Sequence, residues 1–96
     1  MIYIIKLTKE FDTKLRKLIR KSPRIKTKIE NILEKLSNDP RQASLKTHKV
    51  NTSKFGECYS SRVTGDIRII WDYKEDSVVI LVLTIGGHSG KDKVYK

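Results

Sequence analysis

The stretch ECYSSRVTGDIRIIW, residues 57–71, decides the fold of this chain. Two runs rich in β-branched and aromatic residues flank Thr64-Gly65-Asp66, whose composition is typical of a turn. Side chains alternate across a strand, so Ile67 and Trp71 point to the same face of the second run. A three-residue loop that pairs Val63 with Ile67 brings Val63 onto that face as well. The stretch therefore predicts a β-hairpin with one apolar face.

The same register places Arg62 opposite Arg68 on the other face of the hairpin. Two facing arginines repel each other, at a cost of a few tenths to about 1 kcal/mol. An anion between the guanidinium groups would relieve the repulsion, as would nearby carboxylates such as those of Asp66 and Asp72. Two interpretations stay open. The pair is either a phosphate clamp on a sheet face that no helix covers, or one arginine in a weak surface ion pair beside a solvated one.

Two amphipathic helices are predicted before the hairpin. The first begins at Lys9 with Thr8 as its N-cap, and the second has Ser22 as its N-cap with Pro23 at its first position. The second helix ends at residues 38–40, Asn-Asp-Pro. The apolar residues at helical spacing are Phe11, Leu15, Leu18 and Ile19 in the first helix, and Ile25, Ile29, Ile32, Leu33 and Leu36 in the second.

The remaining segments complete a sheet. Residues 2–7 and 78–85 have the apolar, β-branched composition of strands, and the polar segment 43–53 is expected to be a loop with a short strand. Short connections between the C-terminal strands predict consecutive hairpins. We expect a single domain over residues 1–96, in the order β-α-α-β-β-β. This is an α+β fold with two helices packed on one face of a curved antiparallel sheet.

The charge of the chain limits its partners. Twenty-one Lys and Arg residues against 11 Asp and Glu give a net charge of +10 and a pI near 9.9. Such a domain is drawn to nucleic acid, to an acidic protein or to an anionic membrane surface. No run is long enough to cross a membrane and the apolar N-terminus is too short for a signal peptide, so we expect a cytoplasmic protein without a membrane role. The single cysteine, Cys58, and the absence of a Cys/His cluster predict neither a disulfide nor a metal or other cofactor.

Four stretches together resemble the RelE/ParE superfamily of small bacterial toxins, and most closely its RelE and YafQ type of mRNA interferases. They are LKTHKV at 45–50, GECYSSRV at 56–63, GDIRIIW at 65–71, and IGGH at 85–88 followed by Val94-Tyr95. The resemblance implies the RelE-like microbial RNase fold. It also implies the toxin of a type II toxin–antitoxin system, inhibited by a cognate antitoxin from the same operon. The implied activity is an endoribonuclease that enters the 70S ribosome and cuts mRNA in the A site without a metal.

The resemblance also implies a set of catalytic residues. Arg68 matches the arginine of a Gly-x-Arg-hydrophobic pattern, and Arg62 matches a basic position on the preceding strand. His88 stands where members carry Arg or His, Tyr95 matches a C-terminal tyrosine, and His48 matches the histidine of a Leu-x-x-His stretch. Family members also differ from this chain, because the serine at position 60 stands where RelE has a lysine, and the second histidine of YafQ-like members has no counterpart. The identity of the general base therefore stays open.

Cutting RNA without a metal requires a proton acceptor for the 2′-OH, a proton donor for the leaving 5′-oxygen and cations for the phosphate. An imidazole, with an ordinary pKa of about 6.5, suits the proton transfers. We expect His88 to be the acid or base rather than a strand-end residue bonded to a carbonyl, while His48 is either catalytic or solvated. Either Tyr95 acts as a base because adjacent cations lower the pKa of its hydroxyl, or its ring stacks on a nucleobase. Asp66 would orient His88 or neutralise Arg62.

Four lysines are predicted to bind RNA near these residues, namely Lys46, Lys49, Lys91 and Lys93. Two other functions remain open. A ParE-type toxin would bind DNA gyrase with the same scaffold, but such a binding protein does not need the pair of His88 and Tyr95. A catalytically inactive RNA-binding homologue would need only the two arginines.

Overall fold

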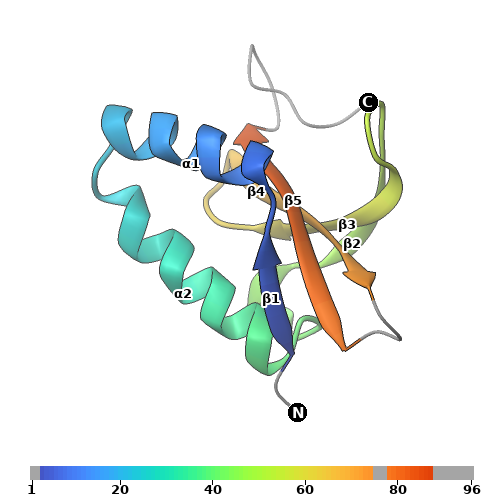
Figure 1. The fold of residues 1–96 in the computed structure, drawn as a ribbon. Helices are drawn as coiled ribbons and strands as arrows, with labels where there is room; N and C mark the ends of the chain where they lie inside the picture. The colour runs from blue at the N-terminus through green and yellow to red at the C-terminus, as the bar shows by residue number, and fades with distance from the viewer. Residues whose placement is uncertain (1–2, 75–77, 88–96) are drawn as a thin grey trace.

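The computed structural model describes residues 3–74 and 78–87 and confirms the α+β fold (Figure 1). The elements in chain order are β1 (Ile4–Leu7), α1 (Lys9–Lys21), α2 (Ile25–Asn38), the short 3₁₀ helix η1 (Ala43–Leu45), β2 (His48–Thr52), β3 (Gly56–Arg62), β4 (Ile67–Lys74) and β5 (Val79–Gly87). The short strand expected within the polar segment 43–53 is β2.

The five strands form one sheet in the order β1-β5-β4-β3-β2. Strands β3 to β5 make the predicted antiparallel meander, and β2 extends it at the edge. Strand β1 instead pairs with β5 in parallel, with Ile4 opposite Val79 and Leu7 opposite Val82. The sheet is therefore mixed, where the sequence led us to expect a purely antiparallel one. Strands β1 and β5 are far apart in the sequence, so no hairpin turn fixes their relative direction.

The helices begin for different local reasons. At α1 the prediction is confirmed, because Thr8 Oγ1 accepts a hydrogen bond from the Phe11 N–H at 3.1 Å. At α2 the predicted cap is wrong. Ser22 instead ends α1, where its N–H donates to the Leu18 carbonyl at 2.8 Å, and α2 starts at Ile25 without a side-chain cap. The chain between the two helices is a tight turn, closed by a 3.0 Å hydrogen bond from the Ile25 N–H to the Ser22 carbonyl.

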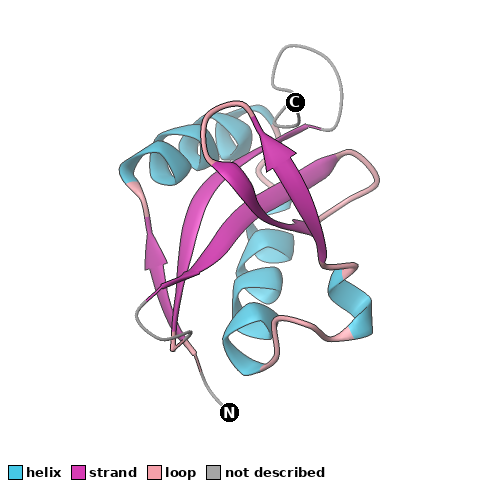
Figure 2. Ribbon diagram, turned by 90° about the vertical axis from the view of Figure 1, so that its right-hand side faces the viewer, coloured by secondary structure: helices cyan, strands magenta, loops and turns pink. Residues whose placement is uncertain are grey.

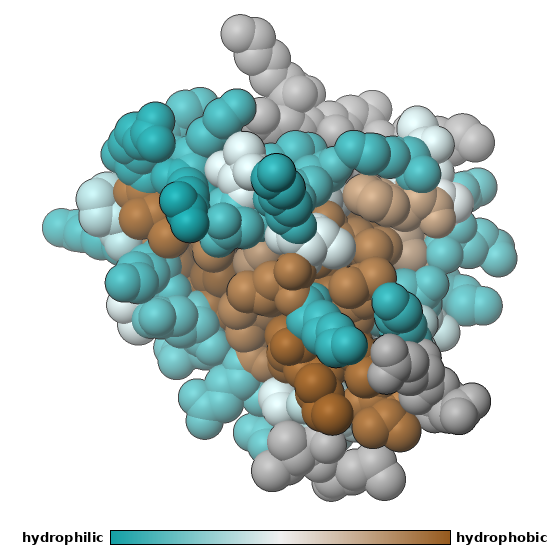
Figure 3. Space-filling model, viewed as in Figure 1, coloured by the Kyte–Doolittle hydropathy of each residue, from teal (hydrophilic) through white to brown (hydrophobic). Residues whose placement is uncertain are grey.

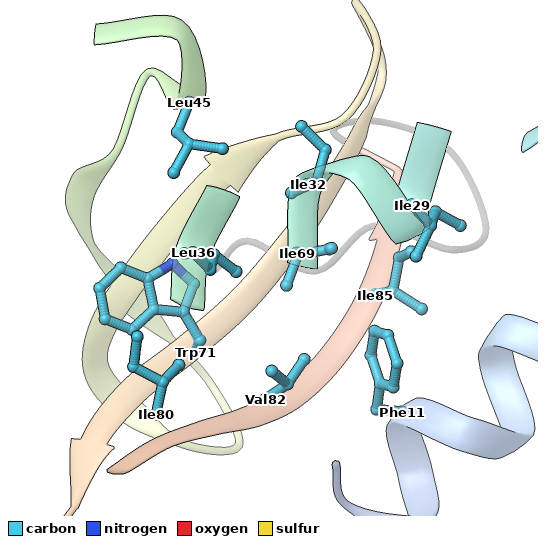
Figure 4. Close-up of a cluster of buried hydrophobic side chains, with 10 residues drawn as sticks. All are labelled: Phe11, Ile29, Ile32, Leu36, Leu45, Ile69, Trp71, Ile80, Val82 and Ile85. Carbon is cyan, nitrogen blue, oxygen red and sulfur yellow. The ribbon is translucent and has the colours of Figure 1, made fainter. Parts of the chain in front are cut away.

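Both helices pack their apolar stripes on one face of the sheet. In Figure 4, buried side chains from α1, α2, β4 and β5 converge into one cluster. Its members are Phe11, Ile29, Ile32, Leu36, Leu45, Ile69, Trp71, Ile80, Val82 and Ile85. At one end of the cluster the Tyr59 ring stacks on Trp71 with 4.8 Å between ring centroids. The opposite face of the sheet is turned to the viewer in Figure 2, with the helices behind the strands.

The surface combines an apolar band with basic helices. Figure 3 shows apolar surface across the part of the molecule where β1 and β5 lie in Figure 1, with hydrophilic side chains along α1 above it. Ile4, Leu7 and Val78 are the large apolar residues that remain exposed in the described part of the chain. Neither α1 nor α2 has the length and apolar content of a membrane-spanning helix.

Candidate active site

The turn between β3 and β4 has the predicted register. The Val63 N–H donates to the Ile67 carbonyl at 2.9 Å, and Arg62 lies directly opposite Arg68. Thr64 holds the loop closed, because its Oγ1 accepts hydrogen bonds from the Asp66 N–H at 3.2 Å and from the Ile67 N–H at 2.9 Å. The two arginines therefore share one face of the hairpin, and this is the face opposite the apolar cluster.

The two arginines have different surroundings. Arg68 is buried, with 7% of its surface exposed, and its Nη1 donates to the Thr64 carbonyl at 2.6 Å and to the Ile67 carbonyl at 3.2 Å. Arg62 is exposed. Backbone carbonyls of the loop thus compensate the charge of one guanidinium group, which is a third way of relieving the repulsion. A guanidinium has five N–H donors, and within the described residues the Nε and Nη2 atoms of Arg68 make no hydrogen bond.

His48 lies on the same face as the arginines. It is the first residue of β2 and pairs with Ser60, which is two residues from Arg62 on β3 and therefore points to the same side. Its Nδ1 lies 3.1 Å from the Lys46 carbonyl oxygen. A carbonyl can only accept, so Nδ1 carries the hydrogen in this contact and the Nε2 of a neutral ring keeps its lone pair. That nitrogen is the one suited to accept a proton.

Glycine completes the row of residues that contains the arginines. Gly86 of β5 pairs with Arg68, and Gly87 pairs with Ile67. We expected these glycines to follow the end of the last strand, but they form its last two rungs. The row that contains Arg62 and Arg68 therefore ends at the buried Gly86, which has no side chain.

The remaining predicted site residues are not all on this face. Lys49 pairs with Tyr59, so it points to the opposite side of the sheet from His48. Lys46 is exposed beside His48, in the left-handed backbone conformation with φ of 52°. Asp66 is exposed within the turn.

The predicted residues of the C-terminal segment lie outside the described residues. They are His88, Lys91, Lys93 and Tyr95.

A polar contact ties α1 to the turn after β2. The Lys54 Nζ bonds to Glu10 Oε1, and Lys14 lies 3.6 Å from the other oxygen of that carboxylate. Partial burial raises the pKa of Glu10, but the hydrogen bond from Lys54 and the charges of Lys14 and Lys54 outweigh it, so the pKa lies below its ordinary value. Sequence inspection did not find this contact, because residues 10 and 54 belong to separate elements.

A lysine-lined hollow between α1 and the end of β5 was also missed. Gly86 belongs to its lining. The available signal was the spacing of Lys14, Lys17 and Lys21, which places them on one side of the helix. Across the described ranges, no three His, Cys, Asp or Glu side chains are grouped as a metal site.

Several solved structures share this fold. The DinJ–YafQ toxin–antitoxin complex of E. coli matches with a TM-score of 0.70 and 19% identity, over 92% of this chain and 94% of that chain. An archaeal RelE–RelB complex from Pyrococcus horikoshii gives 0.64 and 22%, over 95% and 100%. The YoeB/ParE toxin from Agrobacterium tumefaciens gives 0.71 and 15%, over 90% and 99%.

At sequence level, the family described as the ParE toxin of the type II toxin–antitoxin system parDE matches residues 5–91. No curated protein sequence matches the chain.

Proposed function

This chain belongs to the family of ParE toxins of type II toxin–antitoxin systems, and on that premise we propose that it is a ribosome-dependent endoribonuclease that cuts mRNA in the A site. The observation that carries the proposal is the sheet face on which His48, Arg62 and Arg68 lie together. A proton acceptor beside two guanidinium groups is the minimum equipment for cleaving a phosphodiester through the 2′-OH.

The arginines would divide the work on the phosphate. Arg62 is exposed and can turn toward a substrate, whereas Arg68 is held by the Thr64 and Ile67 carbonyls and offers its remaining N–H groups from a fixed position. Fixed donors need little reorganisation when charge builds up on the phosphorus-bound oxygens, so they stabilise the transition state more than the substrate.

The proton transfers would involve the histidines. In the proposed step a histidine takes the proton of the 2′-OH, O2′ forms a bond to phosphorus, and the bond from phosphorus to the 5′-oxygen breaks. A second group protonates that oxygen, which leaves a 2′,3′-cyclic phosphate and a 5′-hydroxyl. The Nε2 of His48 suits the first role, and His88 or Tyr95 would take the second, since all three belong to the predicted set.

The proposal includes the expected partners. A cognate antitoxin is supported by the complexes named for two similar structures, DinJ–YafQ and RelE–RelB. The 70S ribosome, its mRNA and a cytoplasmic location are proposed with the activity, and the net charge of +10 suits a ribosomal partner.

Inhibition of DNA gyrase is the second candidate function. The family match itself favours it, because the matching family is that of the ParE toxins. Gyrase inhibition would require no proton transfer, so it would not depend on an imidazole.

Inducible expression in a bacterial host tests the choice. We expect growth arrest with mRNA cut at codon-defined positions, and loss of both in His48→Ala, Arg62→Ala and His88→Ala variants. Lys49→Ala is the matched control, since its side chain neighbours His48 in sequence but points to the other face. It should behave as the unchanged protein. Mapping of mRNA 5′ ends, with and without 70S ribosomes in vitro, provides the readout.

The opposite outcome is equally defined. Growth arrest with intact mRNA, an SOS response and inhibited supercoiling by purified gyrase would refute the ribonuclease proposal. Growth arrest that persists in both the His48→Ala and the His88→Ala variant would also refute the ribonuclease proposal. If only Lys49→Ala abolished the growth arrest, the active residues would lie on the face of Lys49 and not on the face of His48 and the arginines.

A further inference from the structure

A continuous basic surface follows α1 from its first turn to its end. Three hollows lie along the helix. Lys17 lines all three, Lys14 lines the first two, and Lys21 lines the one that reaches Gly86. At 1.5 Å per residue, Lys14 and Lys21 are separated by about 10 Å along the helix axis. We call the surface formed by Lys14, Lys17 and Lys21 the lysine track.

The lysine track contains charge that no carboxylate of the described residues neutralises. Lys14 shares the Glu10 carboxylate with Lys54, and Asp12 pairs with Arg16 at 3.1 Å. Within residues 3–74 and 78–87, no carboxylate lies within ion-pair distance of Lys17 or Lys21. Two cations on one side of a helix are therefore left for a partner.

At its Lys21 end the track reaches the end of β5, the strand that pairs with the Arg68-bearing β4. The hollow beside Lys21 is floored by Leu18 and Ile85 and includes Gly86, which is the residue opposite Arg68. An apolar floor keeps water from one side of a bound anion, which strengthens its attraction to the surrounding lysines. The lysines lie on the helix-covered side of the sheet and the arginines on the other side, so an RNA strand that contacts both would pass around the end of β5.

We propose that the lysine track binds the sugar-phosphate backbone of RNA outside the cleaved bond, with Lys17 and Lys21 as its main contacts. The inference rests on the proposed function, because it assigns the path of that substrate beyond the active site. An acidic protein segment is the competing occupant. RNA fits better, because the cations recur along about 10 Å of helix and phosphates are evenly spaced, whereas carboxylates in a peptide are not.

The test uses an RNA that cannot be cut. A fluorescein-labelled, single-stranded 2′-O-methyl oligonucleotide is titrated with the full chain, and its affinity is measured by fluorescence anisotropy at several NaCl concentrations. For single strands, each neutralised phosphate contributes about 0.7 to the slope of log affinity against log salt. The double variant Lys17→Gln/Lys21→Gln should therefore reduce the slope by about 1.4, that is 2 × 0.7.

The matched control is Lys26→Gln/Lys28→Gln, which removes the same charge from exposed positions on α2. Its slope should stay that of the unchanged protein. Equal slopes for the two double variants would overturn the proposal, since only net charge would then matter. A Lys17/Lys21 variant that loses binding to polyglutamate but keeps its slope with RNA would also overturn it, in favour of a protein partner.

The outcome is independent of cleavage. Circular dichroism and thermal melting establish that both double variants are folded. If the slope falls as expected but mRNA stays intact in the expression experiment, the ribonuclease proposal fails while RNA binding by the track stands. If mRNA is cut and the slope does not change, RNA binding by the lysine track fails while the ribonuclease proposal stands.

Discussion

The two faces of the β3–β4 hairpin consist of alternating residues of the same two strands, yet they are built on different physical principles. On the helix-covered face, Ile69 and Trp71 are fully buried in the apolar cluster. On the other face, which also holds the buried Ser60 and Ile70, Arg62 stands opposite Arg68, and Arg68 is hydrogen-bonded to carbonyls of the loop. A shift of one residue in register would exchange these roles. Stability and chemistry are therefore carried by neighbouring residues but remain separable by substitution.

The sharpest test of this comparison is Trp71→Ala. Trp71 is fully buried, so its removal leaves a large cavity in the helix-covered face. We expect a loss of about 3–5 kcal/mol in the free energy of unfolding, measured by urea denaturation. Lys74→Ala, at the exposed end of the same strand, should change it by less than about 0.5 kcal/mol. A cost for Trp71→Ala below that of an ordinary surface substitution would contradict the division of roles.

A smaller effect is expected from Ser61→Ala. The Trp71 Nε1–H donates to Ser61 Oγ at 2.8 Å, Ser61 lies 2.7 Å from Thr47 Oγ1, and the Thr47 hydroxyl donates to the Pro40 carbonyl at 2.7 Å. Because the Thr47 hydrogen is used at Pro40, Ser61 must donate to Thr47. Removing Ser61 leaves the buried indole N–H without an acceptor, at a cost of about 1–3 kcal/mol.

A double-mutant cycle identifies the cause of that loss. In a Trp71→Phe background the indole N–H is absent, so Ser61→Ala should cost less than it does in the unchanged protein. Equal costs in both backgrounds, measured by the same denaturation experiment, would show that the Ser61–Trp71 hydrogen bond contributes nothing.

The contact between α1 and the turn after β2 should make the stability depend on pH through Glu10. The pKa of Glu10 lies below its ordinary value of 4.5, so the stability it contributes is present above about pH 4.5 and is lost as the pH falls through the lowered pKa. In Glu10→Gln that part of the acid destabilisation should be missing, and the variant should be less stable than the unchanged protein at pH 7, by up to about 1 kcal/mol. Thermal melting between pH 2 and pH 7, a range of about 5 units chosen to span both states of a carboxyl group, measures the difference. Parallel curves for the two proteins would show that the ion pair with Lys54 is not formed in solution.

The smallest expected effect is a gain. Arg62→Ala removes one member of a like-charged cross-strand pair and no hydrogen bond of the loop, so the free energy of unfolding should rise by a few tenths of a kcal/mol at low salt. The gain should shrink as salt screens the repulsion. Arg68→Ala is the informative contrast, because it removes the same repulsion together with two hydrogen bonds to carbonyls. It should destabilise the protein, and a gain in both variants would contradict the asymmetry of the pair.

The hairpin could be predicted from sequence because its constraints are local. Loop length and alternation fix which residues face each other, and Arg62 opposite Arg68 is confirmed. The hydrogen-bond partners of the Arg68 side chain could not be predicted. A long flexible side chain can reach several acceptors, and the sequence pattern does not indicate which of them it binds. The parallel pairing of β1 with β5 and the contact of Glu10 with Lys54 depend on tertiary packing, for which a single sequence carries no comparable signal. The catalytic roles of His88 and Tyr95 stay predictions, as both lie outside the described residues.

The parallel pairing of β1 also bears on how a cell makes this protein. The Thr8 hydroxyl donates to the Leu83 carbonyl at 2.7 Å, and this contact joins positions 75 residues apart. A chain emerges from the ribosome from its N-terminus, so the first strand to be made waits for the last before it can enter the sheet. The rung that contains Gly86 and Arg68 is completed at the same late stage. During most of its own translation, the nascent chain therefore lacks the rung that joins Arg68 to the last strand.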